Sequence, residues 1–166
     1  MPPVVLIPVN RFDRAKGRLA QHFSAAQRAQ LAIATFETVA LAVRDAGLLS
    51  VALTPDPDAV RALGVATEVI GESSQRHGLN EQLEGIVTQL GPEVLILHAD
   101  LPLATGEAIA AFLDATDEAE TALVRSRDGG TNAMLLRPPG RFTLAYGANS
   151  FAAHDAAARA ACLAVA

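Results

Sequence analysis

Two short polar clusters in the last third of the chain carry residue types suited to binding an anion. The first, Asp128-Gly-Gly-Thr-Asn132, has two glycines whose backbone N–H groups a ligand can approach, followed by the hydroxyl of Thr131. The second, Ala145-Tyr-Gly-Ala-Asn-Ser150, adds Gly147 and the hydroxyl of Ser150 before a helix-forming run. We interpret the clusters as two walls of an anion pocket. Spacing alone favours a plainer interpretation, in which each is a tight turn with a helix cap.

A basic loop near the amino end supplies positive charge. Residues 10–18 contain four cations, among them Lys16 and Arg18, and directly follow the apolar run Val4–Val9. Such a run is typical of a strand buried on both faces, and the loop after the first strand of an α/β sheet is a common place for anionic ligands. A solvated charged loop would have the same composition, so both interpretations stay open.

An acidic residue follows the most hydrophobic predicted strand, Val94–Leu97. Asp100 would lie just past the carboxyl end of this strand, where its oxygens suit Mg²⁺, a cation that prefers oxygen ligands and keeps most of its waters. The alternative is a turn-forming aspartate before Pro102. We favour the metal interpretation because the acid follows a buried strand. His98 has no second His or Cys at metal-binding spacing and is expected to be a packed residue.

The elements that must position these residues alternate between strand and helix. Apolar runs predict strands over residues 4–9, 49–54, 66–70, 94–97, 121–125 and 133–136. Helices are predicted from the capping box at Ser24 to the stop at Gly47, from a cap at Asp58 to residue 63, from 79–80 to about 90, over 106–115 after a Thr105 cap, and after Ser150. This alternation predicts a three-layer α/β fold with a mainly parallel central sheet and right-handed crossovers. Within it, Asn80 would either cap its helix, the commoner use, or face a nucleotide.

Composition limits the classes of protein to which the chain can belong. Its 166 residues predict one domain, residues 1–166, and 51% apolar with only 19% charged residues argue against extended disorder. The net charge of −5 argues against a general nucleic-acid partner. Cys162 is the single cysteine, Met1-Pro-Pro3 lacks a basic signal-peptide region, and Glu37 and Arg44 interrupt the longest apolar candidate for a membrane span. We therefore expect a cytoplasmic protein without a membrane partner.

With the motifs in place, the sequence resembles the CofC/FbiD family, guanylyltransferases of coenzyme F420 biosynthesis with a MobA-like, glycosyltransferase-A fold. The matching pieces occur in the family's order and cover nearly the whole chain, and Gly-Gly-Thr-Asn is the most specific of them. They are Ile7-Pro-Val9, Ala15-Lys-Gly-Arg-Leu-Ala20, Arg28, Leu31-Ala32, Gly78-Leu-Asn80, Ala99-Asp-Leu-Pro-Leu103, Gly129-Gly-Thr-Asn-Ala133, Tyr146-Gly147, Ser150-Phe151 and His154.

The resemblance implies a reaction and a division of labour. The phosphate of a three-carbon phosphoacid, which is phosphoenolpyruvate, 2-phospho-L-lactate or 3-phospho-D-glycerate, would attack the α-phosphorus of GTP and release pyrophosphate. Positioning and charge neutralisation matter more here than a base, because the nucleophile is already an anion. By resemblance, Lys16 and Arg18 would hold the triphosphate, Asp100 the magnesium, and Asn80 would lie near the nucleotide.

The same resemblance assigns Thr131, Gly147 and Ser150 to the phosphoacid, which agrees with the anion pocket inferred from the two polar clusters. Three features depart from the family pattern. Asn10 stands where a lysine is usual, Gly17 where serine is common, and residues 76–77 are Arg-His where an acidic residue is frequent before Gly78.

A further departure concerns carboxylates. Family members usually continue into a strand with an Asp-x-Asp pair that completes the magnesium site, whereas no Asp or Glu follows Asp155 here. We therefore expect slow or absent guanylyl transfer with retained binding of phosphate-bearing ligands, and an uncovered edge of the sheet. Two alternatives remain: a related nucleotidyltransferase with another acceptor, and a non-catalytic homologue that binds phosphate ligands.

Overall fold

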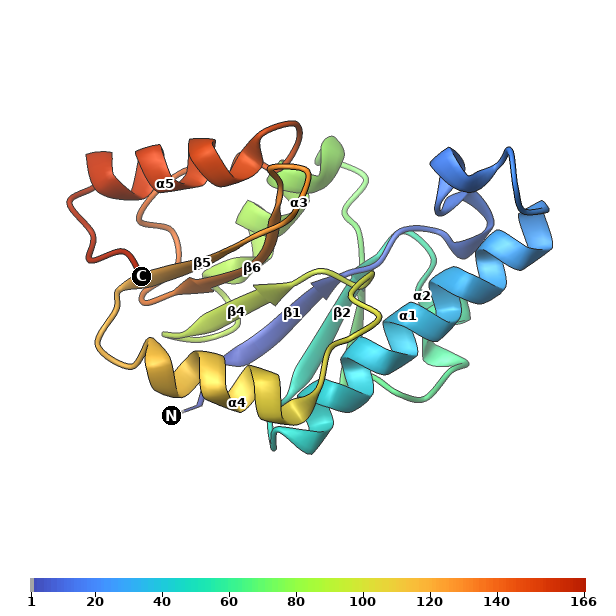
Figure 1. Cartoon of the computed structure of the whole chain (residues 1–166), viewed down its shortest axis with the longest axis horizontal. Helices are drawn as coiled ribbons and strands as arrows, with labels where there is room; N and C mark the ends of the chain where they lie inside the picture. Colours follow the sequence, from blue (N-terminus) through green and yellow to red (C-terminus); the bar gives the residue numbers. More distant parts are fainter. Residues whose placement is uncertain (1) are drawn as a thin grey trace.

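A six-stranded sheet with the order β3-β2-β1-β4-β6-β5 runs through the computed structural model, which describes residues 2–166 (Figure 1). The strands are β1 (Val4–Pro8), β2 (Ser50–Thr54), β3 (Glu68–Gly71), β4 (Val94–Leu97), β5 (Thr121–Arg125) and β6 (Thr131–Leu136). The helices are α1 (Ala25–Asp45), α2 (Pro57–Arg61), α3 (Gly78–Val87), α4 (Gly106–Ala115) and α5 (Ser150–Ala160), with short 3₁₀ turns at Phe12–Arg14 and Gly17–Leu19.

The sheet is mostly parallel, as predicted. β1 pairs in parallel with β2 and β4, and β2 with β3, whereas β6 is antiparallel to both of its neighbours, β4 and β5. The reversal brings the amino end of β6 beside the carboxyl end of β4. There Leu97 pairs with Ala133, and the His98 N–H donates to the Asn132 carbonyl at 3.1 Å. Residues that begin β6 therefore lie next to residues that follow β4.

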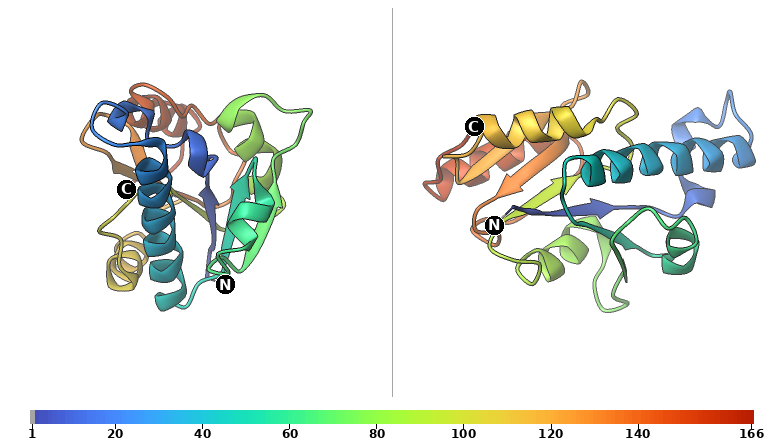
Figure 2. Two further views of the ribbon diagram at one scale, coloured as in Figure 1. Left: turned by 90° about the vertical axis from the view of Figure 1, so that its right-hand side faces the viewer. Right: turned by 90° about the horizontal axis from the view of Figure 1, so that it is seen from below.

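Helices cover both faces of the sheet, which gives three layers (Figure 2). Alternate residues of each strand enter two different cores because their side chains point to opposite faces. On one face Val5, Ile7 and Leu95 pack with Phe36 of α1 and Ile109 of α4. On the other face a second core forms around α3, from Leu6, Val51, Leu53, Leu83, Ile86, Val87, Val94, Ile96, Met134, Leu136 and Leu144.

Two of the predicted side-chain caps, at Ser24 and Thr105, are present. Ser24 accepts from the Gln27 N–H at 3.2 Å in a complete capping box, and the Thr105 hydroxyl accepts from the Ala108 N–H at 3.1 Å. The predicted cap at Asp58 is wrong. Helix α2 begins two residues earlier, with Pro57 in its first turn, and Asp58 instead pairs with Arg61 one turn along at 3.1 Å. Proline is favoured there because its fixed φ suits the first turn of a helix.

The outer edge of β5 is partly covered, contrary to the expectation of an uncovered edge. The N–H of Thr121 donates to the Ala164 carbonyl at 3.1 Å, and the Leu123 N–H donates to the Ala166 carbonyl at 3.0 Å. Val165 forms a parallel bridge with Thr121. The chain after α5 therefore satisfies backbone groups that would otherwise face water at the amino end of β5.

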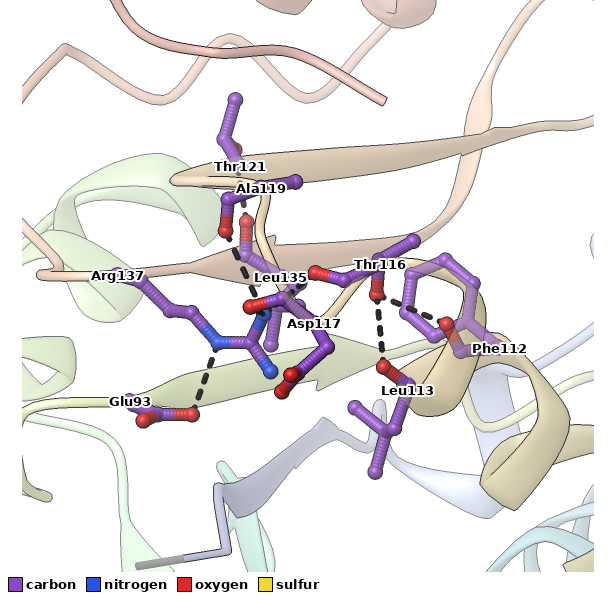
Figure 3. Close-up of polar contacts among 9 residues, drawn as sticks. All are labelled: Glu93, Phe112, Leu113, Thr116, Asp117, Ala119, Thr121, Leu135 and Arg137. Atoms are coloured by element: carbon purple, nitrogen blue, oxygen red, sulfur yellow. Dashed lines mark hydrogen bonds and ion pairs between the residues drawn. The ribbon is translucent and has the colours of Figure 1, made fainter.

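Arg137 follows β6 directly, at the end of this strand opposite to Thr131, and its side chain connects several segments (Figure 3). Its guanidinium donates to the Glu93 carboxylate at 2.9 Å and to the carbonyl of Thr116 at 2.6 Å. It also reaches the carbonyls of Asp117 and Ala119, at 3.2 and 3.4 Å. One cation thus ties the connection between α4 and β5 to the start of β4, which holds β6 and its neighbours in register.

Candidate active site

A cavity of about 440 Å³ opens where β1 and β4 end. The residues after β1 and β4 line it together with the start of α3. They include Asn10, Phe12, Lys16, Glu72, Gly78, Leu79, His98 and Asp100. The carboxyl edge of a parallel sheet is the usual ligand site of α/β folds, and this cavity lies there.

The two basic residues predicted to bind a triphosphate point to different places. Lys16 lines the cavity and has a left-handed backbone with a φ of +54°, uncommon for a residue with a side chain. Arg18 projects into solvent with 95% of its side chain exposed, and its guanidinium lies 3.9 Å from the Asp128 carboxylate. That exposed ion pair contributes little to stability, but it brings the basic loop close to the turn between β5 and β6.

Asp100 lies in the turn after β4 and lines the same cavity, with its carboxylate exposed. Among residues 2–166 no group of three or more His, Cys, Asp or Glu is arranged to hold a metal ion. The donor set nevertheless suits Mg²⁺, which commonly takes one or two protein carboxylates and completes its shell with waters and phosphate oxygens. Glu72 is a second carboxylate of the cavity, and burial raises its pKa, which disfavours its charged form.

Asn80 has a use that neither sequence interpretation included. It lies inside α3, whose first turn follows His77, and its side chain does not cap the helix. Its Oδ1 accepts from the Tyr146 N–H at 2.7 Å, and its Nδ2 donates to the Tyr146 carbonyl at 3.1 Å. Asn80 therefore anchors the second polar cluster to α3. A nucleotide contact by Asn80 stays a prediction, while its neighbours Gly78 and Leu79 line the cavity.

The two polar clusters meet, as the anion-pocket interpretation requires. Thr131 at the start of β6 and Ser150 at the start of α5 are 4% and 2% exposed, and their hydroxyl oxygens lie 3.2 Å apart. Thr131 also lies 3.0 Å from Nδ1 of His154, a fully buried residue. His154 was among the residues that carry the family resemblance, but no contact was assigned to it from the sequence. The signal was available, because residues 150 and 154 are four apart on a predicted helix and so share one face.

The glycines of the clusters serve different purposes. Gly129 has a φ of +87° in the turn between β5 and β6, and Gly147 has a φ of +149°. Gly130 does not need a positive φ, but a Cβ there would lie 2.8 Å from Oγ of Ser126 and 3.8 Å from Oγ of Ser150. The absence of a side chain at residue 130 therefore leaves space next to the Ser150 hydroxyl.

A row of aromatic rings joins the hydroxyl pair to the cavity. The rings of His98 and Tyr146 are 5.1 Å apart, and those of Tyr146 and His154 are 4.7 Å apart, edge to face. Burial lowers the pKa of His98, an effect that nearby Asp100 opposes, and burial raises the pKa of the Tyr146 hydroxyl. Burial, with repulsion from His98, lowers the pKa of His154 to about 4, so its imidazole is neutral at pH 7.

In the described residues, Nε2 of His98 and the hydroxyl of Tyr146 are buried without a hydrogen-bond partner. Because His98 also lines the cavity, an unsatisfied nitrogen lies at the wall that a ligand would meet. The site thus has two parts. One is the cavity lined by Lys16 and Asp100, and the other is the buried hydroxyl pair of Thr131 and Ser150, which lies at the neighbouring strand β6.

Comparison with known proteins finds a matching family and named relatives. Residues 3–166 match the family described as "Guanylyl transferase CofC like". The phosphoenolpyruvate guanylyltransferase of Rubrobacter xylanophilus is 35% identical over 95% of this chain and 80% of that protein. The 2-phospho-L-lactate guanylyltransferase of Methanoregula boonei is 35% identical over 93% of this chain and 67% of that protein.

Solved structures share the fold at low identity. A putative nucleotide-diphospho-sugar transferase from Desulfovibrio desulfuricans superposes with a TM-score of 0.81 at 15% identity, covering 98% of this chain and 78% of that one. A CMP:2-keto-3-deoxy-manno-octonic acid synthetase with bound CTP has a TM-score of 0.63 at 11% identity, covering 99% and 88% of the two chains. At these identities the likeness establishes the fold, which is the predicted nucleotidyltransferase type. Separately, no helix among residues 2–166 has the length and apolar character needed to cross a bilayer.

Proposed function

The chain belongs to the CofC-like guanylyl transferase family, and from this premise we propose that it transfers GMP from GTP to a three-carbon phosphoacid. The acceptor is phosphoenolpyruvate, 2-phospho-L-lactate or 3-phospho-D-glycerate, and the product is an intermediate of coenzyme F420 biosynthesis. The names of the relatives from Rubrobacter and Methanoregula support the first two acceptors.

In the proposed reaction, a phosphate oxygen of the phosphoacid forms a bond to the α-phosphorus of GTP. The bond from that phosphorus to the bridging oxygen of the β-phosphate breaks, and pyrophosphate leaves with the electron pair. No proton has to be removed, because the attacking phosphate is already an anion. The protein's task is to bring two anions together and to neutralise their repulsion.

Each part of the site, the cavity and the hydroxyl pair, would bind one reactant. Lys16 in the cavity and Arg18, which projects into solvent near Asp128, would bind the triphosphate as cations. Asp100 would hold a Mg²⁺ ion, which when bound supplies positive charge at the phosphate oxygens. The phosphoacid would bind beside the cavity, at Thr131, Gly147 and Ser150.

The observation that carries this proposal is the adjacency created by the reversed strand β6. It sets the buried Thr131–Ser150 hydroxyl pair beside the end of β4, where Asp100 lies in the cavity with Lys16. A nucleotide in the cavity and an anion at the hydroxyl pair would therefore be neighbours, the arrangement that an in-line transfer between two phosphates requires.

The test is a measurement of pyrophosphate release with GTP, Mg²⁺ and each of the three phosphoacids in turn. Transfer should require GTP rather than ATP or CTP, and should require one phosphoacid. Mass spectrometry of the product should show a guanylyl group joined to that acid. Pyrophosphate release that is independent of every phosphoacid would refute the proposal.

One observation favours a second candidate, a homologue that binds phosphate ligands with little or no transfer. Within residues 2–166, Asp100 is not part of any group of three or more potential metal ligands. The two candidates differ in outcome. The binding homologue would take up GTP and phosphoacid in calorimetry but release no pyrophosphate over hours.

A further inference from the structure

His154 of α5 has both ring nitrogens engaged, and one partner fixes where its proton lies. The backbone N–H of Ala145 donates to Nε2 at 2.8 Å. A backbone N–H can only donate, so Nε2 must offer a lone pair. A neutral imidazole has one N–H, which must then be on Nδ1. The histidine is fully buried, so water does not compete for either nitrogen.

This tautomer sets the direction of the next hydrogen bond. Nδ1 lies 3.0 Å from Oγ1 of Thr131, so Nδ1–H donates and the threonine oxygen accepts. Oγ1 lies 3.2 Å from Oγ of Ser150. The two hydroxyls have two hydrogens between them. One is used in the bond that joins the hydroxyls, and because neither is given to the histidine, one remains.

The opposite tautomer would reverse this result. If Nδ1 carried the lone pair, the Thr131 hydroxyl would donate to the histidine and the Ser150 hydroxyl would donate to Thr131. No hydrogen would remain, and the pair would present only oxygen lone pairs, which repel an anion. The N–H of Ala145 therefore decides, through His154, whether the hydroxyl pair attracts or repels negative charge.

We propose that His154 is a positioning residue that makes the Thr131–Ser150 pair a net hydrogen-bond donor to an anionic oxygen of the acceptor substrate. The proposal rests on the proposed function, in which a phosphoacid occupies this wall, and it adds a residue that does not touch the ligand itself. Two local features favour an anion at the free hydroxyl hydrogen. Ser150 begins an 11-residue helix, whose amino end carries partial positive charge, and the missing side chain of Gly130 leaves space beside it.

Two substitutions separate the functions of the two ring nitrogens. An asparagine amide reaches the position of Nδ1, so His154→Asn keeps a donor for Thr131. The same substitution leaves the backbone N–H of Ala145 without its acceptor. A glutamine amide reaches the position of Nε2, so His154→Gln keeps the bond from Ala145 but withdraws the donor from Thr131. We expect phosphoacid affinity, measured by calorimetry, to fall about tenfold or more in the glutamine variant, as for the loss of a hydrogen bond to a charged group, and clearly less in the asparagine variant.

The GTP affinity of both variants should stay within about twofold of the wild type, since the nucleotide would occupy the cavity and not the hydroxyl pair. Equal losses for GTP and phosphoacid, or a larger phosphoacid loss in the asparagine variant, would overturn the proposal and make His154 a packing residue. Thermal unfolding of both variants provides the control for folding, and affinities are compared only for folded protein.

The tautomer can be measured without any substrate. In ¹⁵N-labelled protein, two-dimensional NMR of the histidine rings should show a proton on Nδ1 of His154 and a bare Nε2. A proton on Nε2 would overturn the proposal. If the wild type binds none of the phosphoacids, the proposed function fails, and this NMR measurement alone then decides the polarity of the hydroxyl pair.

Discussion

Acidification should destabilise the protein through His154, because the folded structure holds this imidazole in its neutral form. Burial and repulsion from His98 lower the pKa of His154 from 6.5 to about 4. The unfolded chain therefore takes up a proton at this residue before the folded protein does. The sign follows from this difference: the stability that neutral His154 contributes is present above pH 6.5 and is lost as the pH falls toward 4.

The size of the loss follows from linkage. The full difference in pKa corresponds to about 3 kcal/mol, and about 2 kcal/mol of it should be lost between pH 7.5 and pH 5. Acid also titrates carboxylates, so the measurement needs a comparison. His154→Gln has no imidazole at this position, whereas His98 and Tyr146, the titratable neighbours whose rings face this row, are present in both proteins.

The assay is urea unfolding followed by circular dichroism, at pH 7.5 and at pH 5, for the wild type and for His154→Gln. At pH 7.5 the wild type should be the more stable, since the variant lacks the bond to Thr131. That advantage should shrink by about 2 kcal/mol at pH 5. An advantage that stays the same at both pH values would refute the reasoning, and would mean that the folded protein accepts the proton on His154 without cost.

Four further substitutions test other parts of the site and the fold. Asp100→Asn should abolish Mg²⁺-dependent GTP binding in calorimetry and leave the unfolding temperature unchanged, because the side chain is exposed; Mg-GTP binding equal to the wild type would make Asp100 a turn residue. Thr131→Val should weaken phosphoacid binding by about 1–3 kcal/mol with GTP affinity nearly unchanged, and equal losses would show a structural role. Asn80→Leu removes both bonds to Tyr146 and should raise hydrogen exchange in residues 145–149 more than in α3, so uniform exchange would contradict the anchoring role. Arg137→Met should lower the free energy of unfolding by about 2–4 kcal/mol, because it leaves Glu93 and several carbonyls unpaired; a loss of ligand affinity in the folded variant would contradict its distance from the site.

The elements that the sequence predicted best are those whose signals are local. Val94–Leu97 and Thr121–Arg125 have the predicted bounds, as does the helix Gly106–Ala115, because apolar runs and a threonine cap determine them within a few residues. The error at Asp58 is also local, since a proline one residue earlier already begins that helix. The β5–β6 hairpin had a signal in its two glycines, but no pairing was predicted for these two strands.

The sequence predicted some of the residues that line the candidate cavity, but it did not predict the hydrogen bonds that join distant parts of the candidate site. The carboxyl ends of strands identify Lys16 and Asp100 as neighbours of one cavity. In contrast, the bonds from Asn80 to Tyr146 join residues 66 positions apart, and the link from Thr131 to His154 joins residues 23 apart. Such pairs depend on how helices pack on the sheet, and no pattern within a single sequence reports that packing.

The strand order also bears on how the chain reaches its folded state. Val4 pairs with Val94 across more than half of the sequence, whereas β5 and β6 are joined by a short hairpin. Closing a long loop costs more entropy before its contacts repay it, so local hairpins form early and distant parallel pairs form late. We therefore expect the hairpin that positions Thr131 to form early, and the cavity at the ends of β1 and β4 to form only after the most distant pairing in the sheet. We expect the two halves of the site to meet late in folding, so that a ligand bound to both would stabilise the contacts that form last.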